Sequence, residues 1–213
     1  MGKISQGILG GFSGKVGTVI GGSWKGIDYM RSIPVSVAKP RTAAQVQQRT
    51  MFTSVLDFLQ SMTSFLRVGF KNYAIKMTTF NAAMAYTLKN AVYGEDPKYF
   101  IVYSDALTSR GSLTGALNGA AASTVPGQVN ISWTDNSGEG TALVGELANV
   151  VIYNPTKDQA VTVIGGNTRS GGAQSVTAPA IFAGEEVHVY LAFQTANQPD
   201  VSNSAYLGQV VAS

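Results

Sequence analysis

The stretch VNISWTDNS, at residues 129–137, decides the fold of this chain. Its apolar residues alternate with polar ones, which places Val129, Ile131 and Trp133 on one face of an extended strand. The polar DNS that follows is typical of a turn. We therefore predict a strand with one buried face, which puts Trp133 in a core.

Further strands of this kind occur in the second half of the chain. VVIYNP, at residues 150–155, ends in an Asn-Pro turn, and EEVHVYLAFQTAN, at residues 185–197, has an apolar residue at every second position. Short alternating strands separated by turn residues are typical of a β-sandwich. We expect such a domain over residues 99–213, with His188 on the outward face of its strand.

The preceding segment, residues 42–98, has the periodicity of helices. A capping box at Thr42, followed by apolar residues at helical spacing, predicts a helix over about residues 43–68. A second apolar stripe predicts a helix that begins near Thr78 and has its stop at Gly94. Two helices of this kind are expected to pack as an antiparallel pair.

The first 41 residues form a third part, which is rich in glycine and has no helical period. Gly21 and Gly22 predict the turn of a hairpin between residues 15–20 and 24–31. Because glycine is frequent here, we expect an arm without a core of its own. The whole chain is thus predicted to be α+β, with an extended N-terminal arm or hairpin at 1–41, a two-helix segment at 42–98, and a β-sandwich that resembles the immunoglobulin and fibronectin type III folds at 99–213.

Charge is distributed unevenly along the chain. Residues 1–80 contain ten Lys and Arg against two acids, a net +8, whereas residues 81–213 contain five against ten, a net −5. This asymmetry predicts either a basic arm on a polyanion or head-to-tail contact between copies. Arg beside Trp or Tyr is typical of protein interfaces and also of single-stranded nucleic-acid surfaces. The residues expected to bind a partner are Phe12, Lys15, Trp24, Lys25, Tyr29, Arg31, Arg41 and Arg49.

No constellation typical of an enzyme occurs in the sequence. GGFSGKV, at residues 10–16, lacks the spacing of a phosphate-binding loop, and Val16 follows Lys15 where Ser or Thr would hold Mg²⁺. With no cysteine and one histidine, neither a zinc site nor a His-based triad can be assigned. We expect no catalytic activity, cofactor or metal. We also expect no secretory signal and no membrane span, because the apolar runs are too short.

Three motifs together resemble a known family. GFSGKVGTVIGGSWKGIDYMRSIP at residues 11–34, KPRTAAQVQQRTMF at residues 39–52 and the later strand motifs are similar to an uncharacterised family, a domain of unknown function, of Bacteroidetes bacteria and their phages. The resemblance implies an association with phages and supplies no catalytic residues.

The expected function is that of a non-enzymatic structural protein of a phage virion or a similar multi-subunit assembly. It would form a homo-oligomer through its arm, bind other assembly proteins, and reside in the virion or, before assembly, in the cytoplasm. Two alternatives remain open. One is a nucleic-acid-binding protein that uses the basic, aromatic arm, and the other is a surface adhesion module that uses the sandwich.

Overall fold

The computed structural model describes residues 2–4, 7, 10–33, 42–95, 98–197 and 200–213. They form two compact units, Met1–Val46 and Gln47–Ser213. The sequence analysis divides the chain after residue 41 and again after residue 98. In the structure the helices and the sandwich belong to one unit, because they share a hydrophobic core.

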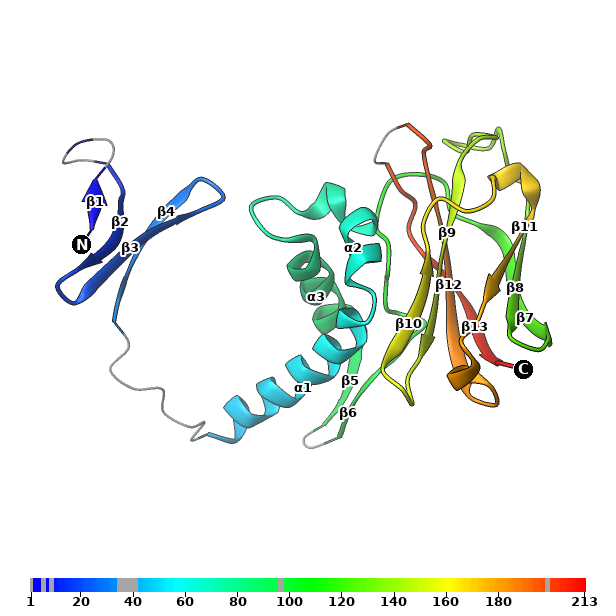
Figure 1. Cartoon of the computed structure of the whole chain (residues 1–213), viewed down its shortest axis with the longest axis horizontal. Helices are drawn as coiled ribbons and strands as arrows, with labels where there is room; N and C mark the ends of the chain where they lie inside the picture. The colour runs from blue at the N-terminus through cyan, green and yellow to red at the C-terminus, as the bar shows by residue number, and fades with distance from the viewer. Residues whose placement is uncertain (1, 5–6, 8–9, 34–41, 96–97, 198–199) are drawn as a thin grey trace. The chain divides into compact units, whose positions relative to one another are not determined.

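The N-terminal unit contains an antiparallel sheet with the strand order β1-β2-β3-β4. Its strands are β1 Lys3–Ile4, β2 Phe12–Val16, β3 Val19–Trp24 and β4 Ile27–Ser32 (Figure 1). The predicted extended arm is therefore a small sheet.

The predicted hairpin turn at Gly21 and Gly22 is wrong, because both glycines lie inside β3. The chain reverses instead at Lys25-Gly26, where both residues have positive φ, as a two-residue hairpin turn requires. Gly21 is needed for a different reason. A Cβ there would lie 2.2 Å from the carbonyl oxygen of Phe12 and 2.6 Å from its ring, so only glycine permits this close approach of Phe12 to β3.

The helices begin largely where the sequence predicts. Thr42 accepts a hydrogen bond from the backbone N–H of Gln45 at 3.3 Å, at the start of α1. Thr78 caps α3 by accepting one from the N–H of Asn81 at 3.1 Å. The helices are α1 Ala43–Gln60, α2 Thr63–Gly69, the short 3-10 helix η1 Lys71–Tyr73, and α3 Thr79–Asn90.

Two helix predictions need correction. The single helix over residues 43–68 is divided at Ser61-Met62, where the hydroxyls of Ser61 and Thr63 donate to backbone carbonyls of the preceding turn and compete with the helical pattern. Gly94 does not end α3. It has a φ of 114° and lies in a hairpin of β5 Val92–Glu95 and β6 Lys98–Ile101.

The remaining strands form a β-sandwich, and the α+β class is confirmed. One sheet has the order β11-β8-β7 and the other β10-β9-β12-β13. Val129, Ile131 and Trp133 are buried between the sheets, as predicted. The strands are β7 Leu117–Val125, β8 Gln128–Thr134, β9 Leu147–Asn154, β10 Gln159–Val163, β11 Ala173–Thr177, β12 Glu186–Gln194 and β13 Ala205–Val211, with 3-10 helices η2 Arg169–Gly171 and η3 Ala180–Phe182.

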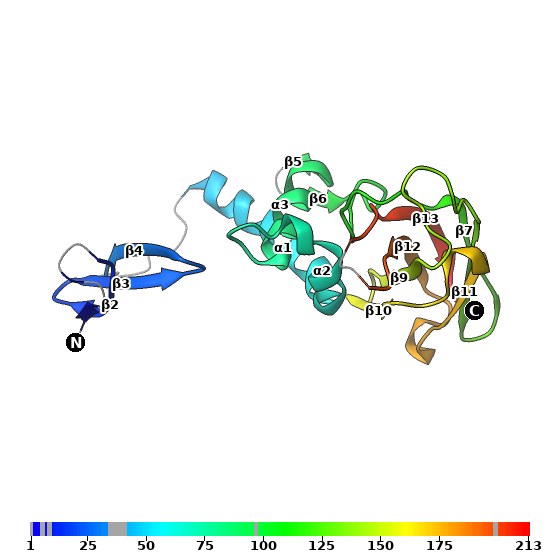
Figure 2. The same ribbon diagram turned by 90° about the horizontal axis from the view of Figure 1, so that it is seen from above.

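The helices form a third layer on the outer face of the larger sheet (Figures 1 and 2). Val150 and Ile152 of β9 point into the core between the two sheets, whereas Val151 and Tyr153 join a second core with the helices. Strands β9 and β12 are therefore buried on both faces.

His188 is 7 % exposed, so the prediction that it lies on a solvent-facing strand surface is wrong. Its ring stacks on Tyr103 with 3.9 Å between centroids, and its Nδ1 lies 2.8 Å from the hydroxyl of Tyr206. Burial lowers the pKa of His188, because the charged imidazolium loses its hydration.

This environment predicts a pH-dependent stability. Because the pKa of His188 is lower in the folded than in the unfolded state, where it is about 6.5, protonation favours unfolding. The free energy of unfolding should be highest above about pH 6.5, the pKa of histidine in the unfolded state, and should decrease as the pH falls below that value. His188→Phe should remove part of this decrease, which urea denaturation between pH 5 and pH 8 would measure. The chain has a single histidine, so its NMR titration is unambiguous. A pH profile identical in the variant would contradict the prediction.

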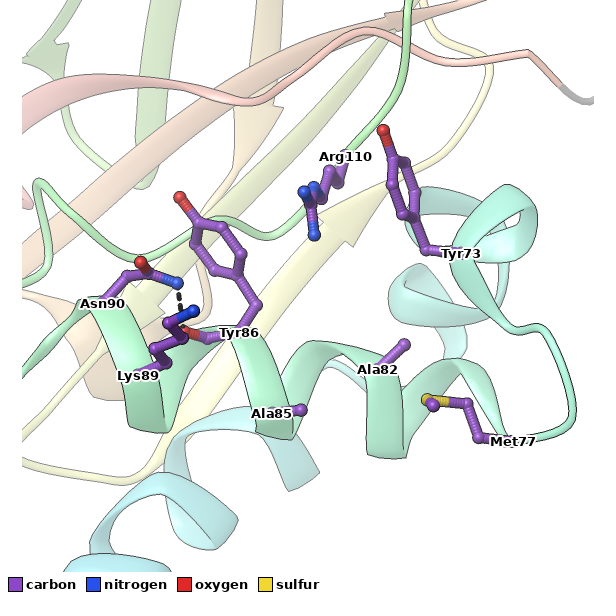
Figure 3. Close-up of a pocket in the computed structure, with 8 residues that line it drawn as sticks. All are labelled: Tyr73, Met77, Ala82, Ala85, Tyr86, Lys89, Asn90 and Arg110. Atoms are coloured by element: carbon purple, nitrogen blue, oxygen red, sulfur yellow. Dashed lines mark hydrogen bonds between the residues drawn. The ribbon is translucent and has the colours of Figure 1, made fainter.

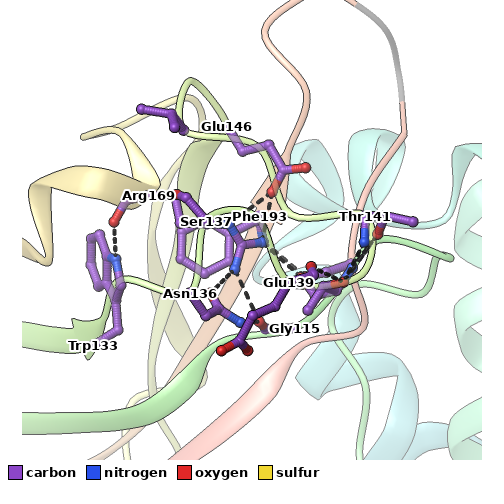
Figure 4. A network of polar contacts seen from close by, with 12 residues as sticks. Gly115, Trp133, Asn136, Ser137, Glu139, Thr141, Glu146, Arg169 and Phe193 are labelled. Carbon is purple, nitrogen blue, oxygen red and sulfur yellow. Dashed lines mark hydrogen bonds and ion pairs between the residues drawn. The ribbon is translucent and has the colours of Figure 1, made fainter.

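A buried polar network connects three loops at one end of the sandwich (Figure 4). The guanidinium of Arg169 donates to Glu146 Oε2 at 2.8 and 2.6 Å, to the carbonyls of Gly115 and Thr114 at 3.1 and 2.7 Å, and to Asn136 Oδ1. All five N–H donors of the guanidinium are thus used. The same group lies 3.8 Å from the centroid of the Phe193 ring. This network holds the loops in place from inside the fold.

Candidate functional site

The N-terminal sheet leaves its large apolar side chains exposed. Of the described residues in this unit, Gly21 alone is buried. Met30 is 72 % exposed and Ile4 59 %, and every residue of β4 is exposed. Fully burying one such side chain is worth about 1.5–3 kcal/mol. Covering the sheet with another apolar surface would therefore be strongly favourable.

Cross-strand register assigns the residues of the sheet to two faces, because directly opposite residues point to the same side. Trp24 lies opposite Ile27, Gly22 opposite Tyr29, and Ile20 opposite both Lys15 and Arg31. The ring of Tyr29 covers Gly22, where a Cβ would lie 3.0 Å from the tyrosine hydroxyl. We call this side the basic face, and its members are Lys3, Ser13, Lys15, Ile20, Gly22, Trp24, Ile27, Tyr29 and Arg31.

The opposite side is less charged, and we call it the apolar face. Asp28 lies there, beside Gly11, so the acid of this sheet is separated from the cations of the basic face. The members of the apolar face are Ile4, Phe12, Gly14, Val16, Val19, Gly21, Ser23, Asp28, Met30 and Ser32.

The predicted partner-binding residues are thus only partly brought together. Lys15, Trp24, Tyr29 and Arg31 share the basic face, and Lys25 is in the adjoining turn with its Nζ 5.5 Å from the Trp24 ring. The others are elsewhere: Phe12 is on the apolar face, Arg49 is exposed on α1, and Arg41 lies outside the described residues.

The sequence analysis missed Ile20 and Ile27, which extend the basic face with apolar area. The alternation of Ile27, Tyr29 and Arg31 after the Lys25-Gly26 turn was the available signal. Predicting the turn four residues too early concealed the register that brings these side chains together.

No group of three or more His, Cys, Asp or Glu side chains that could hold a metal ion occurs within the described ranges. None of the helices in the part of the chain that the structure covers has the length and apolarity to span a membrane.

Comparison with known proteins identifies a family and a structural likeness. No curated protein matches the sequence. The fn3 domain of the human collagen alpha-1(XX) chain is similar with a TM-score of 0.34 and 18 % identity, over 49 % of this chain and 93 % of that domain. The profile of a family of unknown function, DUF6266, matches residues 11–208, which include the N-terminal sheet, the helices and the sandwich. The chain therefore belongs to the family of unknown function DUF6266.

Proposed function

We propose that the protein is a non-enzymatic assembly protein whose N-terminal sheet packs against a second copy of the chain. The observation that carries this proposal is the exposure of large apolar side chains on both faces of the sheet, Trp24, Ile27 and Tyr29 on one and Ile4 and Met30 on the other. A sheet of such short strands gains little stability until something covers it.

Charge complementarity supports a second copy as the partner. The basic face has three cations, Lys3, Lys15 and Arg31, and no acid. Residues 99–213 contain eight acids against three Lys and Arg. Five of those acids are exposed: Asp105, Asp135, Glu139, Asp158 and Glu186. Opposite charges on the two surfaces would favour the encounter and align the copies.

The kind of assembly is the finer part of the proposal. We propose a phage virion or a similar multi-subunit particle, on the resemblance carried by the motifs at residues 11–34 and 39–52. Within such a particle the sandwich unit would be the folded body, and the sheet would be the element that links neighbouring copies.

One observation favours a second candidate function. The basic face combines its three cations with the exposed rings of Trp24 and Tyr29, which is the composition of surfaces that bind single-stranded nucleic acid. Nucleic-acid binding would not explain the exposed side chains of the apolar face, because base stacking and phosphate contacts would use only the basic face. Protein assembly accounts for both faces and is preferred.

Light scattering on the full chain tests the proposal. The wild-type protein should form a multimer, and Trp24→Ser/Tyr29→Ser should raise its dissociation constant roughly 30-fold or more, because central aromatic anchors contribute about 2 kcal/mol or more. These side chains are 44 % and 46 % exposed, so the variant should fold normally. The matched control is Phe100→Ser, an exposed aromatic in β6, which should leave assembly unchanged.

Two outcomes would contradict the proposal. One is a wild-type protein that stays monomeric at every concentration. The other is a monomer that binds single-stranded DNA with an affinity that falls steeply with salt and is lost in Lys15→Gln/Arg31→Gln, because counterion release identifies a nucleic-acid surface.

A further inference from the structure

A second site lies in the larger unit, in a pocket beside α3 (Figure 3). The cavity has a volume of about 380 Å³, within the range of pockets that hold small molecules. Six of its lining residues matter here, namely Tyr73, Ala82, Ala85, Tyr86, Lys89 and Arg110. None of the residues that line it is an acid.

The guanidinium of Arg110 lies between two tyrosine rings. Its central carbon is 4.2 Å from the centroid of the Tyr73 ring and 5.2 Å from that of Tyr86. In Figure 3 the side chain descends between these rings toward Ala82 and Ala85 of α3. The rings flank the guanidinium and shield it from water on two sides.

The main chain around Arg110 is equally well held. The Arg110 N–H donates to the carbonyl of Gly69 at 2.8 Å, and the Ser109 hydroxyl donates to the carbonyl of Ser202 at 2.8 Å. The side chain therefore projects from an anchored segment and needs little reorganisation to bind a ligand.

Arg110 has no anionic partner in the part of the chain that the structure describes. The two ion pairs found there are Lys157–Glu185 and Arg169–Glu146. Asp200, which is near η1, accepts a hydrogen bond from Asn72 at 2.9 Å instead. Arg169 differs in this respect, because all five N–H donors of its guanidinium are used within the fold. The N–H groups of Arg110 are available to the cavity, and Lys89 adds a second positive charge to its wall.

The other residues that line the pocket indicate what kind of group the ligand carries besides its anion. Ala82 and Ala85 leave the space above α3 open, and Tyr73 and Tyr86 border it. Because the guanidinium of Arg110 occupies the gap between the two rings, a small planar organic group would lie over the two alanines. The guanidinium recognises carboxylate or phosphate oxygens in a paired geometry.

We propose that this pocket binds a small planar organic oxyanion, a carboxylate or a phosphate, with Arg110 on the oxyanion and Tyr73 and Tyr86 beside the planar body. The site belongs to the larger unit alone, and the proposal does not depend on the proposed assembly function.

The test uses the full chain and three probes: benzoate, phenyl phosphate and the neutral benzamide. NMR titration should show saturable binding of at least one of the two anions and none of benzamide at the same concentrations. Arg110→Gln should weaken anion binding by about ten-fold or more, since hydrogen bonds to a charged group are the strong ones. Arg67→Gln, which removes an exposed arginine of α2 that does not line the pocket, is the matched control and should leave the affinity unchanged.

A second variant guards against an effect on folding. Ala85→Leu fills the floor of the pocket from an exposed helix position and should abolish binding while the helix remains intact. Tighter binding of phenyl phosphate than of benzoate would assign a phosphate ligand, and the reverse order a carboxylate, and either result supports the site. Absence of saturable binding by both anions, equal binding of benzamide, or undiminished binding by Ala85→Leu would overturn it.

Discussion

Replacement of Arg169 by methionine should lower the free energy of unfolding by about 3–5 kcal/mol, because it leaves a buried carboxylate without its counter-charge. Glu146 is 1 % exposed, and its Oε1 already lacks a hydrogen-bond partner among the described residues. Its other oxygen depends on the two bonds from Arg169. The same change leaves the carbonyls of Thr114 and Gly115 without this donor. Urea denaturation of the full chain would measure the loss.

A double variant separates the charge from the packing. Arg169→Met/Glu146→Leu removes both members of the pair and should recover part of the lost stability, since a buried pair replaced by apolar residues is often close to neutral. Recovery should be incomplete, because the carbonyl of Thr114 still loses the N–H that Arg169 donates to it. The surface pair Lys157–Glu185, with an N···O distance of 3.4 Å, provides the control. Lys157→Met should change the stability by about 1 kcal/mol or less. A double variant less stable than the single one would show that the unpaired carboxylate is not the cause.

Trp133→Ala should destabilise the larger unit by about 3–5 kcal/mol, the usual effect of truncating a large aromatic residue in a core. The indole ring packs edge-on against Phe193 with 5.5 Å between ring centroids, and its Nε1 donates to the carbonyl of Arg169 at 2.6 Å. The substitution therefore removes core volume and one support of the Arg169 loop at the same time. Because typical domain stabilities are about 5–15 kcal/mol, the melting transition should shift markedly or disappear.

Trp133→Phe is the matched variant, because it keeps much of the ring but loses the hydrogen bond. Its effect should be smaller, about 0.5–1.5 kcal/mol for one lost hydrogen bond, because the carbonyl of Arg169 keeps the backbone N–H of Gly172 as a donor at 3.2 Å. The chain has two tryptophans, and Trp24 is exposed in the other unit. In a Trp24→Phe background the fluorescence of Trp133 alone would follow unfolding. An unchanged melting temperature in Trp133→Ala would mean that this side chain does not belong to the core.

Local sequence patterns predicted much of the fold. The alternation in β8 and the capping threonines depend on interactions within a few residues, so Trp133 and Thr78 occupy their predicted places. The interruption of α1 at Ser61 is also a local effect, yet the apolar stripe that runs across it concealed the break.

The basic face was partly predictable. Lys15, Trp24, Tyr29 and Arg31 were identified by residue type, but which of them share a side depends on where the chain turns, and a turn placed four residues away changes the register of the whole hairpin. Phe12 was grouped with them and lies on the opposite face.

The sequence by itself determined the α+β class, the sandwich strands and the basic, aromatic character of the N-terminal part, because residue type and spacing carry that information. Only the tertiary structure decided what covers each surface. His188 alternates with valines like a solvent-facing residue, but the ring of Tyr103, from the segment after β6, stacks on it and Tyr206 of β13 lies beside it, so it is buried. Arg110 lies far along the chain from Tyr73 and close to it in space, and Arg169 meets Glu146 through the folding of two loops. Contacts of this kind join residues distant in sequence, and no local periodicity encodes them.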